Sequence, residues 1–266
     1  MLRILVTNDD GIHALGIHRL VEALLSFPHI DITVVAPSQE QSGVGHGITY
    51  REALSPITNE FHGLPVNAWK VNGTPADCVK AAYHLLQQEG KKYDIVFSGV
   101  NVGNNLGRDV YYSGTCSAAR EAVILGIPSV ALSYDNFFHQ DDYGDVVELI
   151  QPVLQEFLNK AQKGEMPPEV FWNVNIPHIQ KENVKGIAPA VLSLYHYEDK
   201  YHQEQEGYWL RREYREAEEH PENEDYRLLK SGYITITPIH IDSTDRSLLE
   251  EISTWSVSKS WGKKER

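Results

Sequence analysis

The first half of the chain alternates short apolar runs with polar loops and with apolar residues at helical spacing. Residues 2–7 form an apolar, β-rich run that stops at Asn8-Asp9-Asp10-Gly11. Apolar residues then recur at positions 17, 20, 21 and 24, the i, i+3, i+4, i+7 spacing of an amphipathic helix. This pattern predicts a strand, a loop and a helix in succession.

The same alternation continues to about residue 176. Apolar runs predict further strands at residues 32–36, 94–98, 129–133 and 170–176. Helices are predicted from Thr74-Pro75-Ala76-Asp77, from Ser113-Gly114-Thr115 to about Gly126, and over residues 146–157. Strands joined by helices become parallel neighbours in a sheet that is covered on both faces. We therefore expect an α/β fold with a Rossmann-like, doubly wound, mostly parallel sheet.

The pattern weakens beyond about residue 185. Residues 195–230 are charged and tyrosine-rich, with 11 acidic and 4 basic residues between Glu198 and Asp225. Such charge runs usually form solvent-facing surface, so we expect a solvated helix or a projecting arm here. Residues 233–237 alternate like a half-buried strand. We divide the chain into an α/β catalytic core, residues 1–185, and a C-terminal arm with a late strand, residues 186–266.

Charge and cysteine content restrict the partners. The 266 residues include 24 basic and 37 acidic ones, a net charge of −13, which is opposite to what a nucleic-acid polymer requires of a partner. Cys78 and Cys116 form no CxxC pair, and two thiols make no disulfide scaffold, so we expect a reducing, cytoplasmic location. No apolar run approaches the ~18 residues of a membrane span, so we expect no membrane partner.

Candidate chemistry lies in the loops that follow the first three predicted strands. Ligands of a doubly wound sheet bind beyond the carboxyl ends of its strands, and these loops offer mainly oxygen atoms. Two adjacent carboxylates, Asp9 and Asp10, repel each other unless a cation lies between them. With a serine hydroxyl or an asparagine carbonyl they suit Mg²⁺ or Mn²⁺. The same tetrapeptide, residues 8–11, is also ordinary turn chemistry.

The glycine-rich segment from Gly99 to Thr115 offers a second kind of site. Ser113-Gly114-Thr115 opens a predicted helix, where free amides and the helix dipole attract phosphate. Ser113 could equally serve as an ordinary helix cap. His13 is a secondary candidate for proton transfer, with a structural role as the alternative.

Several common signatures are missing from the sequence. It has no GxxxxGK[ST] motif, no complete GxGxxG motif, no GxSxG elbow and no HExxH zinc helix. These absences argue against a P-loop protein, a dehydrogenase, a serine hydrolase and a zinc protease.

Several motifs occur in an order that resembles the SurE family of survival proteins. They are Ile4-Leu5-Val6-Thr7-Asn8-Asp9-Asp10-Gly11, Val35-Ala36-Pro37 leading to Ser42-Gly43, Asn72-Gly73-Thr74-Pro75-Ala76-Asp77, Ser98-Gly99-Val100-Asn101-Val102-Gly103-Asn104-Asn105, and Asp109-Val110-Tyr111-Tyr112-Ser113-Gly114-Thr115. The strong part of the resemblance covers residues 1 to about 135. The chain carries Gly45 and Gly47 where family members usually carry serines.

The resemblance implies a metal-dependent 5′/3′-nucleotidase. It implies that Asp9, Asp10, Ser42 and Asn101 bind the metal, and that Asn105 with Ser113, Gly114 and Thr115 holds the substrate phosphate. It further implies assembly into dimers or tetramers through the C-terminal region.

The expected reaction is metal-assisted hydrolysis of nucleoside 5′- and 3′-monophosphates to nucleoside and phosphate. One Mg²⁺ or Mn²⁺ per subunit would activate a water, and Asp9, Asp10 and Asn105 would act as catalytic residues. Two alternatives stay open. One is a metal- and nucleotide-binding regulator without hydrolysis, and the other is a broad acid phosphatase that acts on other small phosphoesters or polyphosphate.

Overall fold

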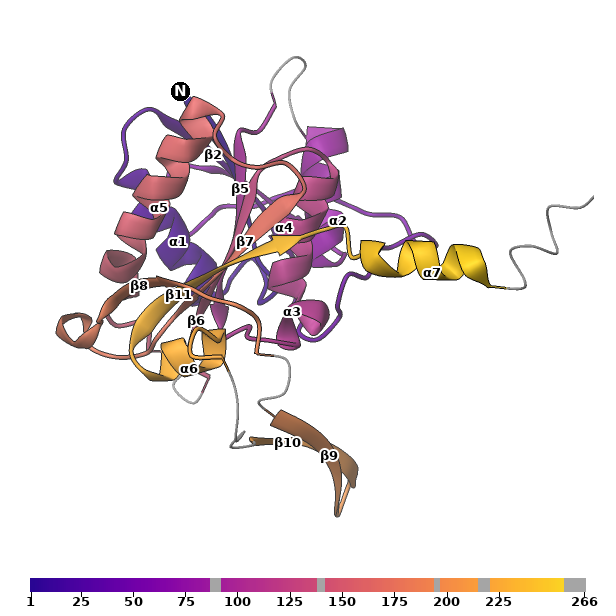
Figure 1. Ribbon diagram of the computed structural model, residues 1–266. Helices are drawn as coiled ribbons and strands as arrows, with labels where there is room; N and C mark the ends of the chain where they lie inside the picture. Colours follow the sequence, from indigo (N-terminus) through magenta and orange to yellow (C-terminus); the bar gives the residue numbers. More distant parts are fainter. Residues whose placement is uncertain (87–91, 138–141, 194–196, 215–220, 256–266) are drawn as a thin grey trace, which may run out of the picture.

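A computed structural model describes residues 1–86, 92–137, 142–193, 197–214 and 221–255, and shows a central sheet between helices (Figure 1). The strands are β1 Leu2–Thr7, β2 Ile30–Pro37, β3 Ile57–Thr58, β4 Asn67–Val71, β5 Ile95–Val102, β6 Ser129–Tyr134, β7 Val170–Ile176, β8 Gly186–Pro189, β9 Tyr197–Glu204, β10 Gly207–Tyr214 and β11 Tyr233–His240. The helices are α1 Leu15–Leu25, α2 Pro75–Ala81, η1 Ala82–Leu86, α3 Asp109–Tyr112, α4 Gly114–Ile124, α5 Val146–Lys163, η2 Lys181–Asn183, α6 Asp225–Lys230, η3 Arg246–Leu248 and α7 Leu249–Thr254.

The main sheet has nine strands in the order β3-β4-β2-β1-β5-β6-β7-β11-β8. Neighbours from β4 to β7 are parallel, whereas β3 and β11 run antiparallel to β4 and β7. This confirms the predicted doubly wound α/β fold. The chain order reverses between β1 and β5, which is where such sheets form their ligand-binding crevice.

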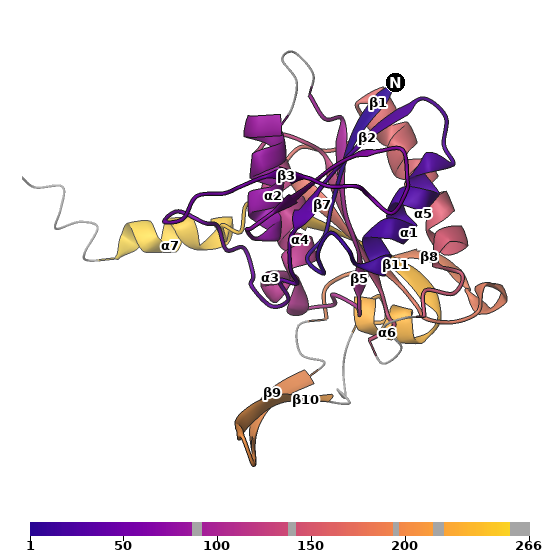
Figure 2. The same cartoon turned by 180° about the vertical axis from the view of Figure 1, so that it is seen from behind.

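Helices cover both faces of the sheet, as the front and back views show (Figures 1 and 2). On one face α1 and α5 pack against Ile4, Val6 and Phe97. On the other face α2 and α4 pack against Leu5, Val35 and Val96. Alternate residues of β1 thus serve opposite cores, which explains why this strand is a continuous apolar run.

The predicted start of the helix at Thr74 is confirmed in detail. The Asp77 amide donates to Thr74 Oγ1 at 3.1 Å, and the Thr74 amide donates to Asp77 Oδ2 at 2.9 Å. Pro75 occupies the first turn, where no intrahelical amide bond is needed. This reciprocal capping box fixes where α2 begins.

Two strand assignments from the sequence need correction. β4 lies in a stretch, residues 67–71, for which no strand is predicted. The third predicted strand continues past Ser98 to Val102, with a register shift between Ser98 and Asn101 against β6. A side chain at Gly99 would meet the Leu132 carbonyl oxygen at 2.2 Å, so only glycine lets the strand continue there. Asn101 therefore lies on the strand rather than in the loop after it.

The charged segment forms a projecting two-stranded hairpin, β9 with β10 (Figures 1 and 2). The expected arm is confirmed, and the alternative of a solvated helix is wrong. Residues 194–196 and 215–220 of this segment lie outside the described residues. Within the described parts of the chain, every helix is too short or too polar to cross a lipid bilayer.

Candidate active site

Asp9 and Asp10 lie at the carboxyl end of β1, beside the point where the strand order reverses. The Asp9 side chain is buried, and Thr115 Oγ1 donates to its Oδ1. Burial raises the pKa of Asp9 above its ordinary value, and burial together with the charge of Asp9 raises the pKa of Asp10 to about 7. The Val102 amide donates to Asp10 Oδ2 at 3.2 Å. The two carboxyl groups are thus held in place by the fold, and ionising both of them costs free energy.

Asn101 presents its side-chain oxygen. Its Nδ2 donates to the carbonyls of Val102 at 3.0 Å and Gly103 at 2.8 Å. The side-chain Oδ1 can therefore bind a ligand. Asn8 Nδ2 is similarly tied to the Gly11 carbonyl, and Asn8 Oδ1 is buried without a hydrogen-bond partner among the described residues. Two carboxylates with amide oxygens nearby are the donors that a hard divalent cation prefers. The described residues contain no cluster of three or more His, Cys, Asp or Glu side chains able to hold a metal.

Ser42 is the predicted ligand in the loop that follows β2. Its side chain is exposed, and Oγ donates to Glu40 Oε1 at 2.7 Å. The loop itself is close to the pair, because the Gln41 amide donates to the Asp9 carbonyl at 2.8 Å. The charge of Glu40 adds to the effect of burial in raising the pKa of Asp9 and Asp10. Glu40 is a neighbouring carboxylate that the sequence reasoning missed, although it stands in the loop after the second strand.

The predicted phosphate cradle lies against the same aspartate. Ser113 caps α4 by accepting from the Cys116 amide at 3.1 Å. A Cβ atom at Gly114 would lie 2.6 Å from Asp9 Cβ, so only glycine allows the helix start to approach this closely. Together with the Thr115 contact, this joins the start of α4 to the carboxylate pair. An anion at the helix start and a cation at Asp9 would be neighbours.

Asn105 is clamped by polar side chains from β6 and β7. Asn175 Oδ1 accepts from the Asn105 amide at 2.7 Å, and the Asn105 carbonyl accepts from Asn173 Nδ2 at 2.8 Å and from Asn175 Nδ2 at 3.1 Å. Asn105 Nδ2 donates to Ser133 Oγ at 2.8 Å. All these residues are buried. Sequence reasoning missed them, although polar residues at alternate positions of a buried strand were a usable signal.

The loop that carries Ser42 is fastened to α2 and α4. Glu121, buried in α4, accepts from Lys80 Nζ at 2.6 Å and lies 2.8 Å from His46 Nε2. Burial tends to raise the pKa of Glu121, but these two partners outweigh it and hold the pKa below its ordinary value. The Gly47 carbonyl accepts from Thr74 Oγ1 at 2.7 Å. Thus His46, which stands between Gly45 and Gly47, anchors the loop.

Comparison with known proteins identifies the family. A family model described as survival protein SurE matches residues 4–199. The chain belongs to the SurE family. A 5′-nucleotidase SurE from Brevibacillus brevis is 66% identical over 99% of this chain and 100% of the relative, and one from Heliobacterium modesticaldum is 40% identical over 96% of this chain and 92% of the relative. The crystal structure of the SurE protein from Aquifex aeolicus matches with a TM-score of 0.77 and 33% identity, covering 94% of this chain and 98% of that one.

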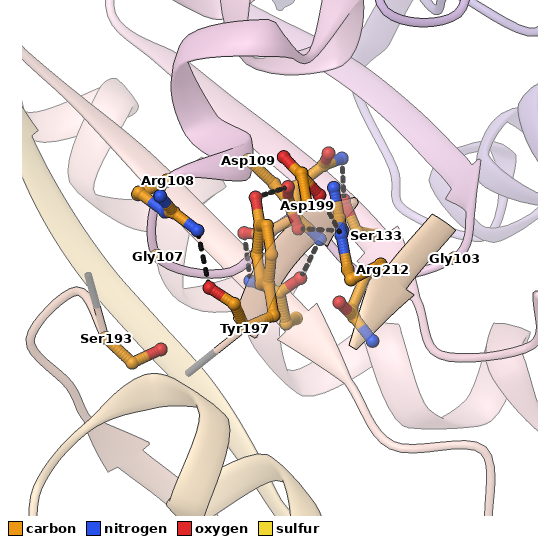
Figure 3. Close-up of polar contacts among 12 residues, drawn as sticks. Gly103, Gly107, Arg108, Asp109, Ser133, Ser193, Tyr197, Asp199 and Arg212 are labelled. Atoms are coloured by element: carbon orange, nitrogen blue, oxygen red, sulfur yellow. Dashed lines mark hydrogen bonds and ion pairs between the residues drawn. The ribbon is translucent and has the colours of Figure 1, made fainter. Parts of the chain in front are cut away.

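The hairpin, most of which follows the matched SurE range, is anchored next to the Asn105 loop (Figure 3). Asp109, the first residue of α3, accepts from Tyr197 Oη at 2.6 Å and from Arg212 Nη1 at 2.9 Å. The Tyr197 ring lies between two guanidinium groups, with Arg212 at 3.7 Å and Arg108 at 4.5 Å from its centroid. The hairpin therefore leaves the body of the protein close to the phosphate cradle.

His13 lies beside a second histidine. Its side chain is exposed, and its ring lies 6.3 Å from that of His62. Its role in proton transfer stays a prediction.

Proposed function

We propose that this chain is a metal-dependent nucleotidase that hydrolyses nucleoside 5′- and 3′-monophosphates to nucleoside and phosphate. The observation that carries the proposal is the contact between Thr115, in the first turn of α4, and the buried Asp9. It joins a set of oxygen donors to an anion-attracting helix start. The names of the SurE relatives, 5′-nucleotidase, support the same reaction class.

The proposed metal ligands are Asp9, Asp10, Asn101 and Ser42, with one Mg²⁺ or Mn²⁺ per subunit. Ser42 Oγ would turn from Glu40 toward the pair, which an exposed loop side chain can do by changing rotamer. When bound, the cation would polarise a phosphoryl oxygen and lower the pKa of water. It would also offset the repulsion between the buried carboxylates.

The remaining steps belong to side chains and amides of the chain. Asp9 or Asp10 accepts the proton of the attacking water. The amides of Gly114 and Thr115, with the hydroxyl of Ser113, hold the phosphoryl oxygens at the start of α4. Asn105 uses one Nδ2 hydrogen to bond Ser133, so its second Nδ2 hydrogen is available to a phosphoryl oxygen.

The test is release of phosphate from a substrate panel. Metal-free protein is assayed with 5′- and 3′-nucleoside monophosphates, a sugar phosphate and short polyphosphate, each with Mg²⁺, with Mn²⁺ and with excess EDTA. We expect fastest turnover of a nucleoside monophosphate and no turnover in EDTA. Equal rates with and without EDTA contradict the metal assignment, and preference for polyphosphate contradicts the nucleotidase assignment.

We also propose that residues 186–266 are an oligomerisation region and that the protein forms a homodimer or homotetramer. Exposed apolar side chains on α7 support this proposal, because such a patch is unusual on a monomer. The cytoplasmic location stays a proposal, supported by Cys78 and Cys116, which are free thiols buried in the cores on the α2 and α4 side.

A further inference from the structure

Exposed apolar side chains occur beside the phosphate cradle as well as on α7 and the hairpin. Tyr111 and Tyr112 of α3 expose 57% and 56% of their surface, and Val44, in the Ser42 loop, exposes 37%. We call these three residues the aromatic patch. Two adjacent exposed tyrosines add nothing to the core and are a feature that ligand-binding surfaces commonly show.

Backbone contacts join the segment that carries the two tyrosines to the loop that carries Val44. The Gly45 amide, which follows Val44, donates to the Tyr112 carbonyl at 2.8 Å, and a Cβ at Gly45 would lie 3.4 Å from the Tyr111 carbonyl oxygen. Tyr112 directly precedes Ser113, the cap of the cradle. Positions 43, 45 and 47 of the facing loop are glycines, so no side chain from them covers the tyrosines.

We propose that the aromatic patch binds the base of a nucleoside monophosphate whose phosphate lies at the start of α4. This inference rests on the proposed function and assigns it a base-binding subsite. Aromatic rings stack on any base, so the patch would favour nucleotides over sugar phosphates without strong selection among bases. Tyr112 and Ser113 are adjacent in the chain, so the ring at position 112 branches from the backbone one residue before the start of α4, where the phosphate would lie.

The direction of attack favours this side of the cradle. In phosphoryl transfer the attacking and leaving oxygens lie roughly in line on opposite sides of phosphorus. Water would approach from the side of Asp9 and Asp10, which Gly114 contacts, so the leaving nucleoside would extend away from them. Phe137, another exposed ring, packs against Gly103 in the loop that follows Asn101, on the carboxylate side. Phe137 is therefore an alternative place for the base to bind, and it is not part of the aromatic patch.

The experiment compares adenosine 5′-monophosphate with ribose 5-phosphate, which is the same sugar phosphate without the base. The variants are Tyr111→Ala/Tyr112→Ala, Tyr111→Phe/Tyr112→Phe, Phe137→Ala and the control Ile124→Ala. Ile124 is also exposed and apolar but ends α4, at the helix terminus away from the cradle. Turnover is measured with Mn²⁺, and binding is measured by calorimetry.

We expect the double alanine variant to raise KM and Kd for the nucleotide about tenfold, as loss of one stacked base would. Its constants for ribose 5-phosphate should change less than twofold, and the double phenylalanine variant should retain nucleotide affinity. Unchanged nucleotide constants in the double alanine variant overturn the inference, as does the same loss in Phe137→Ala or in Ile124→Ala. If the wild-type protein hydrolyses neither compound, the proposed function fails, while calorimetry still decides the base-binding subsite.

Discussion

At the scale of single residues, Asp9 and Asp10 illustrate a conflict between stability and chemistry. Burial and mutual repulsion disfavour their charged forms, and the hydrogen bonds that Thr115 and Val102 donate offset this only in part. Neutral side chains of the same size would fit the fold at lower cost. Carboxylates in such a setting are a strong indication of a bound cation.

Asp10→Asn tests this directly, because it removes charge and almost no volume. We expect Mn²⁺-dependent phosphate release to fall about a hundredfold or more, with the melting temperature of the metal-free protein unchanged or higher. The control is Asp31→Asn, a partly exposed aspartate paired with Arg3. Near wild-type turnover by Asp10→Asn would remove this residue from the ligand set.

Ser133 and Ser129 allow a matched test of Asn105 positioning. Both are fully buried on β6. The Ser133 hydroxyl bonds Asn105 Nδ2 at 2.8 Å, and the Ser129 hydroxyl bonds the Ala119 carbonyl at 2.5 Å. Ser133→Ala and Ser129→Ala should each reduce the free energy of unfolding by about 1 kcal/mol. Only Ser133→Ala should also lower kcat, by about tenfold, because the Asn105 amide loses its orientation. Denaturant titration and steady-state kinetics measure the two effects, and equal kinetics in both variants would contradict the positioning role.

At the scale of elements, the loop of residues 38–49 depends on contacts with helices far away in sequence. Thr49 donates its amide and hydroxyl to Asp77 of α2, and His46 contacts Glu121 of α4. Asp77 thereby serves both the helix cap and the loop. This loop and the start of α2 thus form a single structural unit.

Glu121 gives that unit a measurable dependence on pH. Its pKa is lowered in the folded protein, so its stabilising effect is complete above about pH 4.3, the ordinary glutamate pKa, and is lost as pH falls through the lower folded value. Glu121→Gln should reduce the free energy of unfolding by about 2 kcal/mol at pH 7. The difference from wild type should shrink as the pH falls from 5 to 3. Chemical denaturation at several pH values measures this, and a difference that is independent of pH would contradict it.

Local sequence predicted those elements whose signals are local. The central strands of the parallel sheet, from β2 to β7 without β4, and the capped start of α2 were predicted because apolar runs and the Thr74–Asp77 box need no distant partner. β4 was missed because its residues are only half-buried, at the side of the sheet that ends in β3. Its apolar residues therefore follow neither the two-residue spacing of a strand nor the 3.6-residue spacing of a helix. The hairpin was ambiguous because almost all side chains of β9 are exposed, on both of its faces, so no buried face imposes the apolar alternation that distinguishes a strand from a helix.

The same distinction applies to the candidate site. Asp9, Asp10 and Asn101 could be located because strand ends in a doubly wound sheet meet at one edge. The clamp on Asn105 could not, since Ser133, Asn173 and Asn175 come from strands far along the chain. Which polar atoms of buried strands meet depends on their register in the sheet, which the sequence pattern does not specify.

At the scale of the whole molecule, the exposed apolar residues of α7 are the strongest indication of assembly. Leu249 and Ile252 of α7, with Leu248 just before the helix and Trp255 just after it, each expose between 42% and 53% of their surface. The helix extends from the body (Figure 1). An isolated helix of this length is marginal in water, so packing against another surface would stabilise it. Leu249 and Ile252 are three residues apart in α7, which places them on one face of the helix.

Leu249→Glu/Ile252→Glu tests whether this face joins copies of the chain. Two added charges at an apolar contact would have to be buried without partners, so we expect the dimer or tetramer to dissociate into smaller species. Each charge also adds to the net −13 of every subunit, which increases repulsion between copies, especially at low salt. Size-exclusion chromatography with light scattering measures the mass, with Glu251→Gln on the same helix as the control. A wild-type mass equal to one chain at all concentrations, or an unchanged mass in the double variant, would assign the exposed face to something other than self-assembly.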